Sequence, residues 1–347
     1  MDMPAAISSV IDRKDLARSE MNSVMRLIMT GEATQAQIGG FLVGLRMKGE
    51  TVEEIVGAAQ IMRELATPVE VTDEYLVDTC GTGGSGIAKF NVSTASAFVT
   101  AAAGARVAKH GNRAATSKSG SADLLEEAGA EIMLTPEQVA RCIDTIGVGF
   151  MFAVSHHAAM KHAIGPRKEM VVRTLFNMLG PLTNPARAKR QVMGVYHPSL
   201  VRTAAEVLSQ LGSEHVMVVH SADGLDEISI AGETHVAELK GGVVTEYDIS
   251  PEDFSLKRSS LDLLKVSDPG ESLTLVRGAL DGSVEAASDI VAMNAGAAIY
   301  VSGQALSLEA GVEMAKDAIG AGLASEKMKD FIDFTRQITD DHAGTPG

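Results

Sequence analysis

The sequence has few of the residues that build disulfide frameworks, membrane spans or nucleic-acid interfaces. Its 347 residues include two cysteines, no tryptophan and only 4% aromatic residues. Cys80 and Cys142 cannot form a disulfide framework, and no Cys-x-x-Cys pair suggests zinc. The longest apolar stretch, 95–105, has about eleven residues, whereas a membrane span needs about twenty. Residues 1–4 carry no basic region before an apolar run, so we expect a reduced, cytoplasmic protein with no membrane partner.

Positive charge is also scarce. The formal net charge is −15, from 30 basic and 45 acidic residues. Nucleic-acid binders usually carry a basic face with stacking aromatics, so a nucleic-acid partner is disfavoured. Apolar residues make up 45% of the chain and charged residues 22%, which is typical of a folded globular protein of about two structural units. Any cluster of basic residues in so acidic a chain is therefore informative.

The first seventy residues have the pattern of a small helical domain. Capping boxes at 34–37 and 51–54 each precede an apolar rhythm of helical spacing. An earlier helix has four apolar residues on one face, Met21, Val24, Met25 and Ile28. We predict three short amphipathic helices in a domain over 1–70, joined by helices from about 168–188.

From Tyr75 onward, short β-prone runs alternate with helical ones. The expected strands are 75–78, 106–108, 148–152, 192–196 and 216–220. Residues 235–238 and 245–248, connected through Gly241 and Gly242, have the pattern of an appended hairpin. This alternation predicts an α/β fold over 71–347, with a mostly parallel central sheet flanked by helices.

Three segments predict a phosphate site. The glycine-rich segment 81–86 follows a strand, but no helix opens at once and no Gly-Lys-Ser/Thr follows, so dinucleotide and Walker loops are excluded. Ser93 and Thr94 open a helix, whose N-terminus attracts phosphate; capping alone is the alternative. The basic string 109–113 follows the expected strand over 106–108 and is itself followed by Lys118 and a further helix start. Together these segments favour phosphate binding over a solvated surface.

Two further clusters have weaker signals. The adjacent carboxylates of Asp226 and Glu227 suit magnesium beside a phosphate, although such pairs are also common on surfaces. Arg167 and Arg173 could each hold a substrate carboxylate through two parallel hydrogen bonds, or form an ion pair on a helix surface. The histidines at 156, 157 and 162 lack the spacing of a helical zinc pair, so we expect core or surface histidines.

Taken together, the motifs resemble those of the anthranilate phosphoribosyltransferase family over nearly the whole chain. The matching segments, in order, are Gly81–Gly84, Phe90–Thr94, Lys109–Arg113, Lys118–Gly120, Arg173–Asn177, Gly180–Pro185 and Asp223–Glu227. The resemblance implies a small helical domain, a larger α/β domain, a cleft between them and a homodimer. It also implies an enzyme of tryptophan biosynthesis that transfers the phosphoribosyl group of 5-phosphoribosyl 1-pyrophosphate (PRPP) to the amine of anthranilate, releasing pyrophosphate.

The resemblance also implies roles for particular residues. Catalytic positions are Lys109, His110 and Arg167; anthranilate contacts are Gly81, Asn112 and Arg167; and two Mg²⁺ ions are held with Ser93, Asp226 and Glu227. The PRPP-binding positions are Gly81, Gly84, Ser85, Lys89, Asn91, Val92, Ser93, Thr94, Lys109, His110, Gly111, Asn112, Arg113, Ala114, Ala115, Thr116, Ser117 and Ser121.

Two residues depart from the usual pattern of the family. Ser85 stands where the family commonly has Asp, and Lys89 where an uncharged residue is common. We hypothesise that Lys89 partly replaces metal at the pyrophosphate. Two alternatives to the transferase remain: a pyrimidine nucleoside phosphorylase of the same general fold, and a non-enzymatic nucleic-acid-binding relative.

Overall fold

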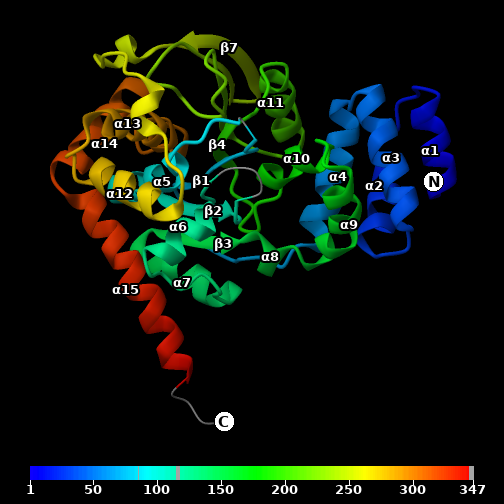
Figure 1. Cartoon of the computed structure of the whole chain (residues 1–347), viewed down its shortest axis with the longest axis horizontal. Coiled ribbons are helices and arrows are strands. Elements are labelled where there is room, and N and C mark those ends of the chain that lie inside the picture. The colour runs from blue at the N-terminus through cyan, green and yellow to red at the C-terminus, as the bar shows by residue number, and fades with distance from the viewer. Residues whose placement is uncertain (85, 115–117, 344–347) are drawn as a thin grey trace.

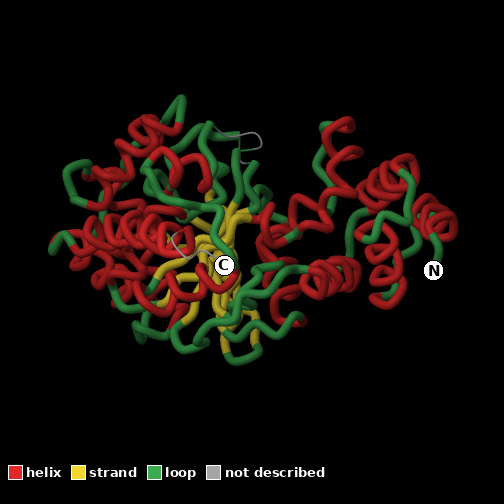
Figure 2. The backbone as a smooth tube through the Cα atoms, turned by 90° about the horizontal axis from the view of Figure 1, so that it is seen from below, coloured by secondary structure: helices red, strands yellow, loops and turns green. Residues whose placement is uncertain are grey.

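The protein has a helical part and a part built on a β-sheet, which lie side by side (Figures 1 and 2). The computed structural model describes residues 1–84, 86–114 and 118–343. No helix in these ranges is long and apolar enough to cross a membrane.

The helical part opens with four helices rather than the predicted three. They are α1 (Met3–Ile11), α2 (Arg18–Met29), α3 (Gln35–Lys48) and α4 (Val52–Leu65). The predicted apolar face of α2 is buried, and Thr34 and Thr51 cap α3 and α4 through capping boxes. The sequence prediction missed α1, which is capped by Asp2 at its N-terminus. Its buried face consists of three side chains, those of Met3, Ala6 and Val10.

Residues from the middle of the chain complete the helical part. Helix α9 (Lys161–Met170) packs against α2 and α3, and α10 (Phe176–Leu179) contacts α4. Within the predicted helices over about 168–188, the segment 168–179 is not continuously helical, because the chain breaks at Val171, where φ is 52°. A β-branched residue rarely adopts this left-handed conformation, so sequence pattern gives no warning of the break.

Among the described residues the sheet has seven strands, in the order β3-β2-β1-β4-β5-β6-β7. Their bounds are β1 Leu76–Gly81, β2 Arg106–Gly111, β3 Val148–Phe152, β4 Arg190–Gly194, β5 His215–Ser221, β6 Thr234–Lys240 and β7 Val243–Ile249. The first five strands are parallel, and the predicted hairpin of β6 and β7 is confirmed at one edge. The fold is therefore α/β with a mostly parallel sheet, as predicted.

Helices cover both faces of the sheet. The Ala-rich α13 (Glu285–Ser302) is buried against α5 (Val92–Ala102) and β4, while α11 (Leu200–Gln210) packs on β5 and also contacts α4. Apolar residues of α4, α11 and β5 belong to one continuous core, so the helical part and the sheet share a hydrophobic cluster. The remaining helices are α6 (Ser121–Glu127), α7 (Pro136–Ile146), α8 (Ala153–His156), α12 (Pro269–Leu280), α14 (Leu308–Gly320) and α15 (Leu323–Ala343), with short 3-10 turns η1 (Ala158–Met160), η2 (Gly180–Leu182), η3 (Pro251–Phe254) and η4 (Leu261–Leu264).

Candidate functional site

The candidate site lies where β1 and β4 end side by side. Their last residues, Gly81 and Gly194, are partners in the parallel ladder. A Cβ at Gly194 would lie 1.6 Å from the Asp226 carbonyl oxygen, and one at Gly81 would lie 2.9 Å from the Asp226 carboxylate. These two glycines therefore allow the segment that carries Asp226 to cross the strand ends.

The glycine-rich segment is a turn that Thr82 attaches to the end of β4. Thr82 donates its N–H to the Gly194 carbonyl at 2.8 Å, and its hydroxyl accepts the N–H of Tyr196 at 3.0 Å. Gly83, Gly84 and Gly86 have φ of 64°, 78° and 78°, a region that favours glycine. Ser85, a predicted PRPP-binding residue, lies outside the described residues. No helix begins after this segment before Val92, as expected for a loop unlike the dinucleotide motif.

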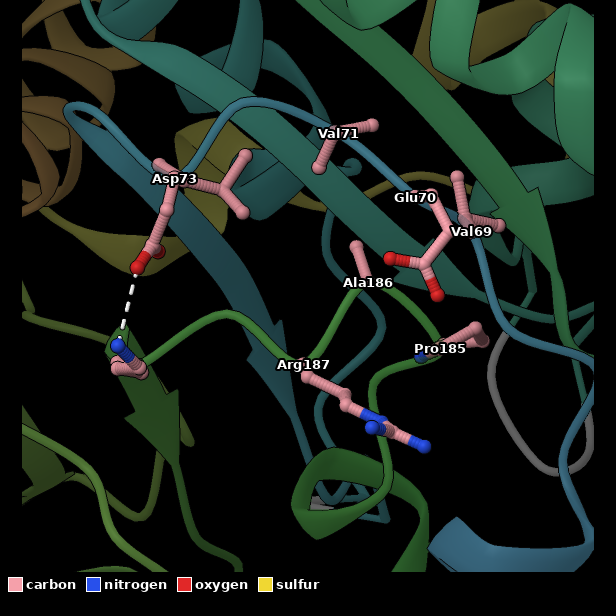
Figure 3. Close-up of a pocket in the computed structure, with 9 residues that line it drawn as sticks. Val69, Glu70, Val71, Asp73, Pro185, Ala186 and Arg187 are labelled. Atoms are coloured by element: carbon pink, nitrogen blue, oxygen red, sulfur yellow. Dashed lines mark hydrogen bonds and ion pairs between the residues drawn. The ribbon is translucent and has the colours of Figure 1, made fainter.

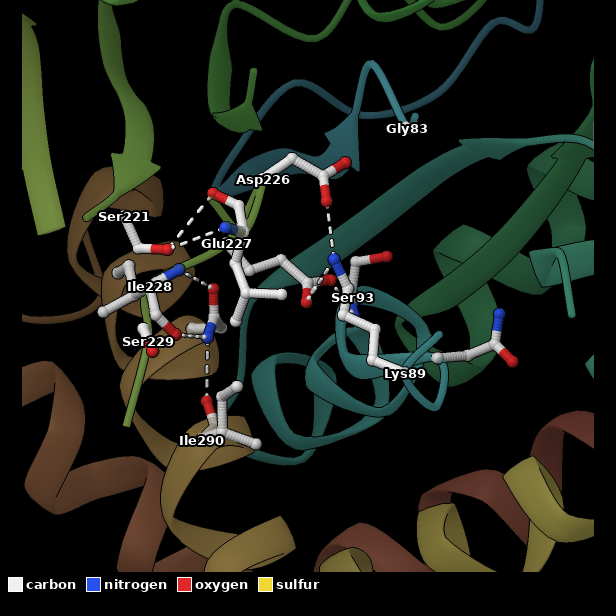
Figure 4. A network of polar contacts seen from close by, with 12 residues as sticks. Gly83, Lys89, Ser93, Ser221, Asp226, Glu227, Ile228, Ser229 and Ile290 are labelled. Carbon is white, nitrogen blue, oxygen red and sulfur yellow. Dashed lines mark hydrogen bonds and ion pairs between the residues drawn. The ribbon is translucent and has the colours of Figure 1, made fainter. Parts of the chain in front are cut away.

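Lys89 forms an ion pair with both candidate metal carboxylates (Figure 4). Its Nζ lies 2.5 Å from Asp226 Oδ1 and 3.2 Å from Glu227 Oε2. Burial alone would lower the pKa of Lys89, but the two carboxylates outweigh burial and hold that pKa well above its usual value. Burial raises the pKa of Glu227 to about 7 against the opposing charge of Lys89. Burial would also raise the pKa of Asp226, but the charge of Lys89 together with hydrogen bonds from Lys89 and the backbone lowers it.

Ser93, at the start of α5, joins the carboxylates to Lys109. Its N–H donates to Glu227 Oε1 at 3.2 Å, and its hydroxyl accepts from Lys109 Nζ at 3.3 Å. Lys109 also donates to the Thr79 carbonyl at 2.6 Å and is only 3% exposed. Burial lowers the pKa of Lys109, although the nearby charge of Asp78 opposes it. The ammonium group thus lies beneath the site, between β1 and α5.

The candidate metal site has few ligand atoms, and their chemistry indicates which metal ions they fit. In the described ranges, no group of three or more His, Cys, Asp and Glu residues could hold a metal ion. Ser93, Asp226 and Glu227 do lie together, and they offer two carboxylates and a hydroxyl. Mg²⁺ accepts such a set, because water and phosphate oxygens complete its coordination. The residues present therefore fit Mg²⁺ and disfavour zinc.

The segment after β2 is attached to the start of α5. Asn91 and Ser119 exchange two hydrogen bonds, and the Thr94 hydroxyl donates to that of Ser121 at 3.1 Å. Arg113 instead forms ion pairs with Asp123 and Glu126 of α6, so its guanidinium is already engaged. The predicted contacts Ala115, Thr116 and Ser117 lie outside the described residues.

His110, which the sequence places in the basic string 109–113, packs with buried histidines in the structure. Its ring lies 5.1 Å from that of His157, and burial holds its pKa well below the usual value. Burial also lowers the pKa of His156, and that of His157 to about 4. His156 and His157 are buried, as expected for core histidines.

Of the two candidate arginines, Arg173 is the one that touches the glycine-rich segment. Its guanidinium lies 4.4 Å from the centre of the Tyr196 ring and donates to the Gly84 carbonyl. Arg167, on α9, instead stacks 5.2 Å from the ring of Phe176. The residue pattern left the two arginines equal, and only the resemblance gave Arg167 a contact with anthranilate. The contact of Arg173 with Tyr196 was not predicted, because it depends on the break after α9.

A cavity of about 160 Å³ lies elsewhere, near the first residue of β1 (Figure 3). Val69, Asp73, Arg187 and Lys189 are among its lining residues, and Lys189 pairs with Asp73 at 3.0 Å. It contains none of the predicted site residues. The candidate site is therefore defined by converging polar groups and not by this cavity.

The helical bundle beside a mostly parallel sheet, with a glycine turn and paired carboxylates at the carboxyl ends of β1 and β4, is the architecture of a glycosyl transferase. Residues 4–66 match the helical bundle domain of the glycosyl transferase family, and residues 73–325 match its a/b domain. The chain belongs to the anthranilate phosphoribosyltransferase family. It is 63% identical over 342 residues to the anthranilate phosphoribosyltransferase of Cellvibrio japonicus, covering 97% of this chain and 100% of the relative.

Two solved structures share the fold. The anthranilate phosphoribosyltransferase of Thermus thermophilus superposes with a TM-score of 0.90 at 42% identity, covering 95% of this chain and 99% of that one. The Saccharomyces cerevisiae anthranilate phosphoribosyltransferase in complex with PRPP and Mg gives a TM-score of 0.87 at 24% identity, covering 96% and 98%. At that identity the yeast structure supports the fold alone.

Proposed function

We propose that this protein transfers the phosphoribosyl group of PRPP to the amine of anthranilate, giving N-(5-phosphoribosyl)anthranilate and pyrophosphate, the second step of tryptophan biosynthesis. The observation that carries the proposal is the convergence of the glycine turn, the start of α5 and the Asp226–Glu227 pair at the carboxyl ends of β1 and β4. This convergence occurs in a chain 63% identical to an anthranilate phosphoribosyltransferase along almost its whole length.

The glycine turn and the start of α5 supply the groups that bind the donor. The positive end of the α5 dipole and the backbone of the glycine turn attract phosphate oxygens, although the N–H groups of Val92, Ser93 and Thr94 already donate to Phe90, Glu227 and Asn91. The Asn91–Ser119 and Thr94–Ser121 hydrogen bonds place the segment after β2 beside them. Further proposed PRPP contacts, which rest on the sequence alone, are Ser85, Ala115, Thr116 and Ser117. On the acceptor side, the positions proposed for anthranilate are Gly81, Asn112 and Arg167.

Asp226, Glu227 and Ser93 are the residues that would hold Mg²⁺, and we propose two ions in the working enzyme. Bound Mg²⁺ neutralises charge on the pyrophosphate. Within the protein, Glu227 is oriented by the N–H of Ser93, and Asp226 is fixed by the close approach of its backbone to Gly194. The carboxylates are therefore positioned before any ligand arrives.

In the reaction, the C1–O bond to pyrophosphate breaks and the bond from C1 to the anthranilate nitrogen forms. The sugar becomes oxocarbenium-like while negative charge grows on the leaving group, so aimed N–H groups and the Lys109 ammonium stabilise the transition state. The aniline amine is neutral at pH 7 and needs no strong base, and the proton that its nitrogen loses when the C1–N bond forms passes to solvent. His110 follows Lys109 in the chain, but burial lowers the pKa of its ring, so we assign it no role as a base.

We also propose a division into a helical domain over 1–70, completed by α9 and α10, and an α/β domain over 71–347. The shared apolar cluster of α4, α11 and β5 supports a fixed arrangement of the two at this contact. A homodimer and a cytoplasmic location complete the proposal.

The test is the loss of anthranilate fluorescence when the purified protein is mixed with anthranilate, PRPP and Mg²⁺. We expect loss that requires all three components and releases one pyrophosphate per anthranilate consumed. Thymidine with inorganic phosphate serves as the control for a nucleoside phosphorylase. Release of thymine without any use of anthranilate would overturn the proposal.

A further inference from the structure

Lys89 occupies a buried position between two carboxylates that the proposed function assigns to a metal. Its side chain is 14% exposed, and those of Asp226 and Glu227 are 7% and 11% exposed. Lys89 lies in the segment between the glycine turn and α5, so it reaches the carboxylates from the side on which we place PRPP (Figure 4). The ammonium therefore stands where an entering cation would have to bind.

The carboxylates cannot easily do without a cation. Two buried carboxylates side by side repel each other when both are ionised and have lost water, so a positive partner stabilises their ionised form. Glu227 Oε2 is buried and makes no hydrogen bond within the described residues. The ammonium nitrogen of Lys89 lies 3.2 Å from this oxygen. Glu227 Oε1 already accepts the N–H of Ser93. The ion pair with Lys89 thus supplies the charge neutralisation that a divalent ion would supply.

We propose that Lys89 is a built-in cation that competes with divalent metal for Asp226 and Glu227. In the protein without substrate the ammonium occupies the pair, and metal binds both carboxylates only when Lys89 moves away. The phosphate oxygens of the donor offer the ammonium a new partner on the same side of the site. This inference rests on the proposed function for the identity of the donor, whereas the competition itself is a property of the chain alone.

The test measures Mn²⁺ binding to the substrate-free protein by electron paramagnetic resonance. We expect the wild type to bind no Mn²⁺ at this pair at submillimolar concentration. The Lys89→Met variant, which keeps the length of the side chain without its charge, should gain one site with affinity at least about tenfold higher, because a unit positive charge has been removed from beside both carboxylates. Lys89→Arg should resemble the wild type. Adding Asp226→Asn to Lys89→Met should abolish the new site.

Lys48 provides a matched control. It also bridges two carboxylates from a buried position, at 2.7 Å from Asp15 and 3.0 Å from Glu54. The oxygens of Glu54 already accept the N–H groups of Leu16 and Thr51. We therefore expect Lys48→Met to lose stability without gaining a Mn²⁺ site.

Tight Mn²⁺ binding by the wild type, or equal binding by wild type and Lys89→Met, would overturn the inference. If Lys89→Met does not fold, the wild-type and Lys89→Arg measurements still decide the matter, because tight binding by either contradicts competition. Failure of the proposed function is separate: it appears as no use of anthranilate by the wild type, and the Mn²⁺ comparison does not depend on it.

Discussion

Lys109 shows how one side chain can serve both the fold and the site. Its ammonium is buried between the Thr79 carbonyl and the Ser93 hydroxyl, near the charge of Asp78. We expect Lys109→Met to lower kcat/KM by about 10²–10³, the usual effect of removing one group that stabilises transition-state charge. Anthranilate fluorescence measures the rate, and Lys14→Met, at an exposed ion pair, is the control. An unchanged kcat/KM in a folded variant would contradict the role of Lys109.

The sequence was better at naming residues that lie close together than at naming the partner of each side chain. Ser93, Asp226 and Glu227 were predicted as one group, and the structure brings them together. The position of Lys89 between the two carboxylates could not be predicted, because it depends on the path of an irregular segment opposite a turn more than 130 residues away. Motif spacing records which residues are present, whereas partners across loops are set by backbone geometry.

At the scale of elements, Gly194 shows what a strand end needs in order to admit a crossing segment. A methyl group there would overlap the Asp226 carbonyl, so Gly194→Ala must displace the backbone that carries the carboxylates. We expect a loss of about 1–3 kcal/mol in the free energy of unfolding and at least about a tenfold fall in kcat/KM for PRPP. Thermal unfolding and initial rates measure these effects.

Gly40→Ala is the matched control for this prediction. Gly40 lies within α3 and a Cβ there would meet nothing within 4 Å. Because alanine loses less chain entropy than glycine in a helix, we expect a gain of about 0.5–1 kcal/mol and unchanged rates. Equal behaviour of Gly194→Ala and Gly40→Ala would show that the crossing segment tolerates the added methyl group.

Elements with strong periodicity or capping were predicted, and those without were not. The helix face of α2, the capping boxes of α3 and α4, and the hairpin of β6 and β7 were all predicted from local pattern. Helix α1 has a narrow apolar face, and the break at Val171 depends on packing of α9 and α10 against distant helices. Tertiary contacts therefore decided these two elements.

For the whole molecule, the buried histidines make stability depend on pH. His156 is hydrogen-bonded to Thr67, on the connection from α4 to β1, and His157 packs near His110 of β2. The unfolded chain binds a proton at His157 near pH 6.5, whereas burial lowers the folded pKa to about 4. Stability therefore falls as the pH drops from 6.5 toward 4, by about 2 kcal/mol for His157 alone at pH 5.

Denaturant unfolding at pH 7 and pH 5 tests this prediction. His157→Gln should lose less stability than the wild type over this interval, by about 2 kcal/mol. His197→Gln, at an exposed residue of the loop before α11, should behave as the wild type. Parallel curves for wild type and His157→Gln would refute the assignment.

The strand order also decides when the protein can assemble on the ribosome. β1 ends at residue 81, but β4, its hydrogen-bonded neighbour, starts only at residue 190, and α2 and α3 must likewise await α9. A nascent chain that has passed residue 81 but not yet reached residue 194 therefore presents an open strand edge and uncovered apolar helix faces, which invite aggregation. This exposure lasts while the segment between residues 81 and 194 is being translated.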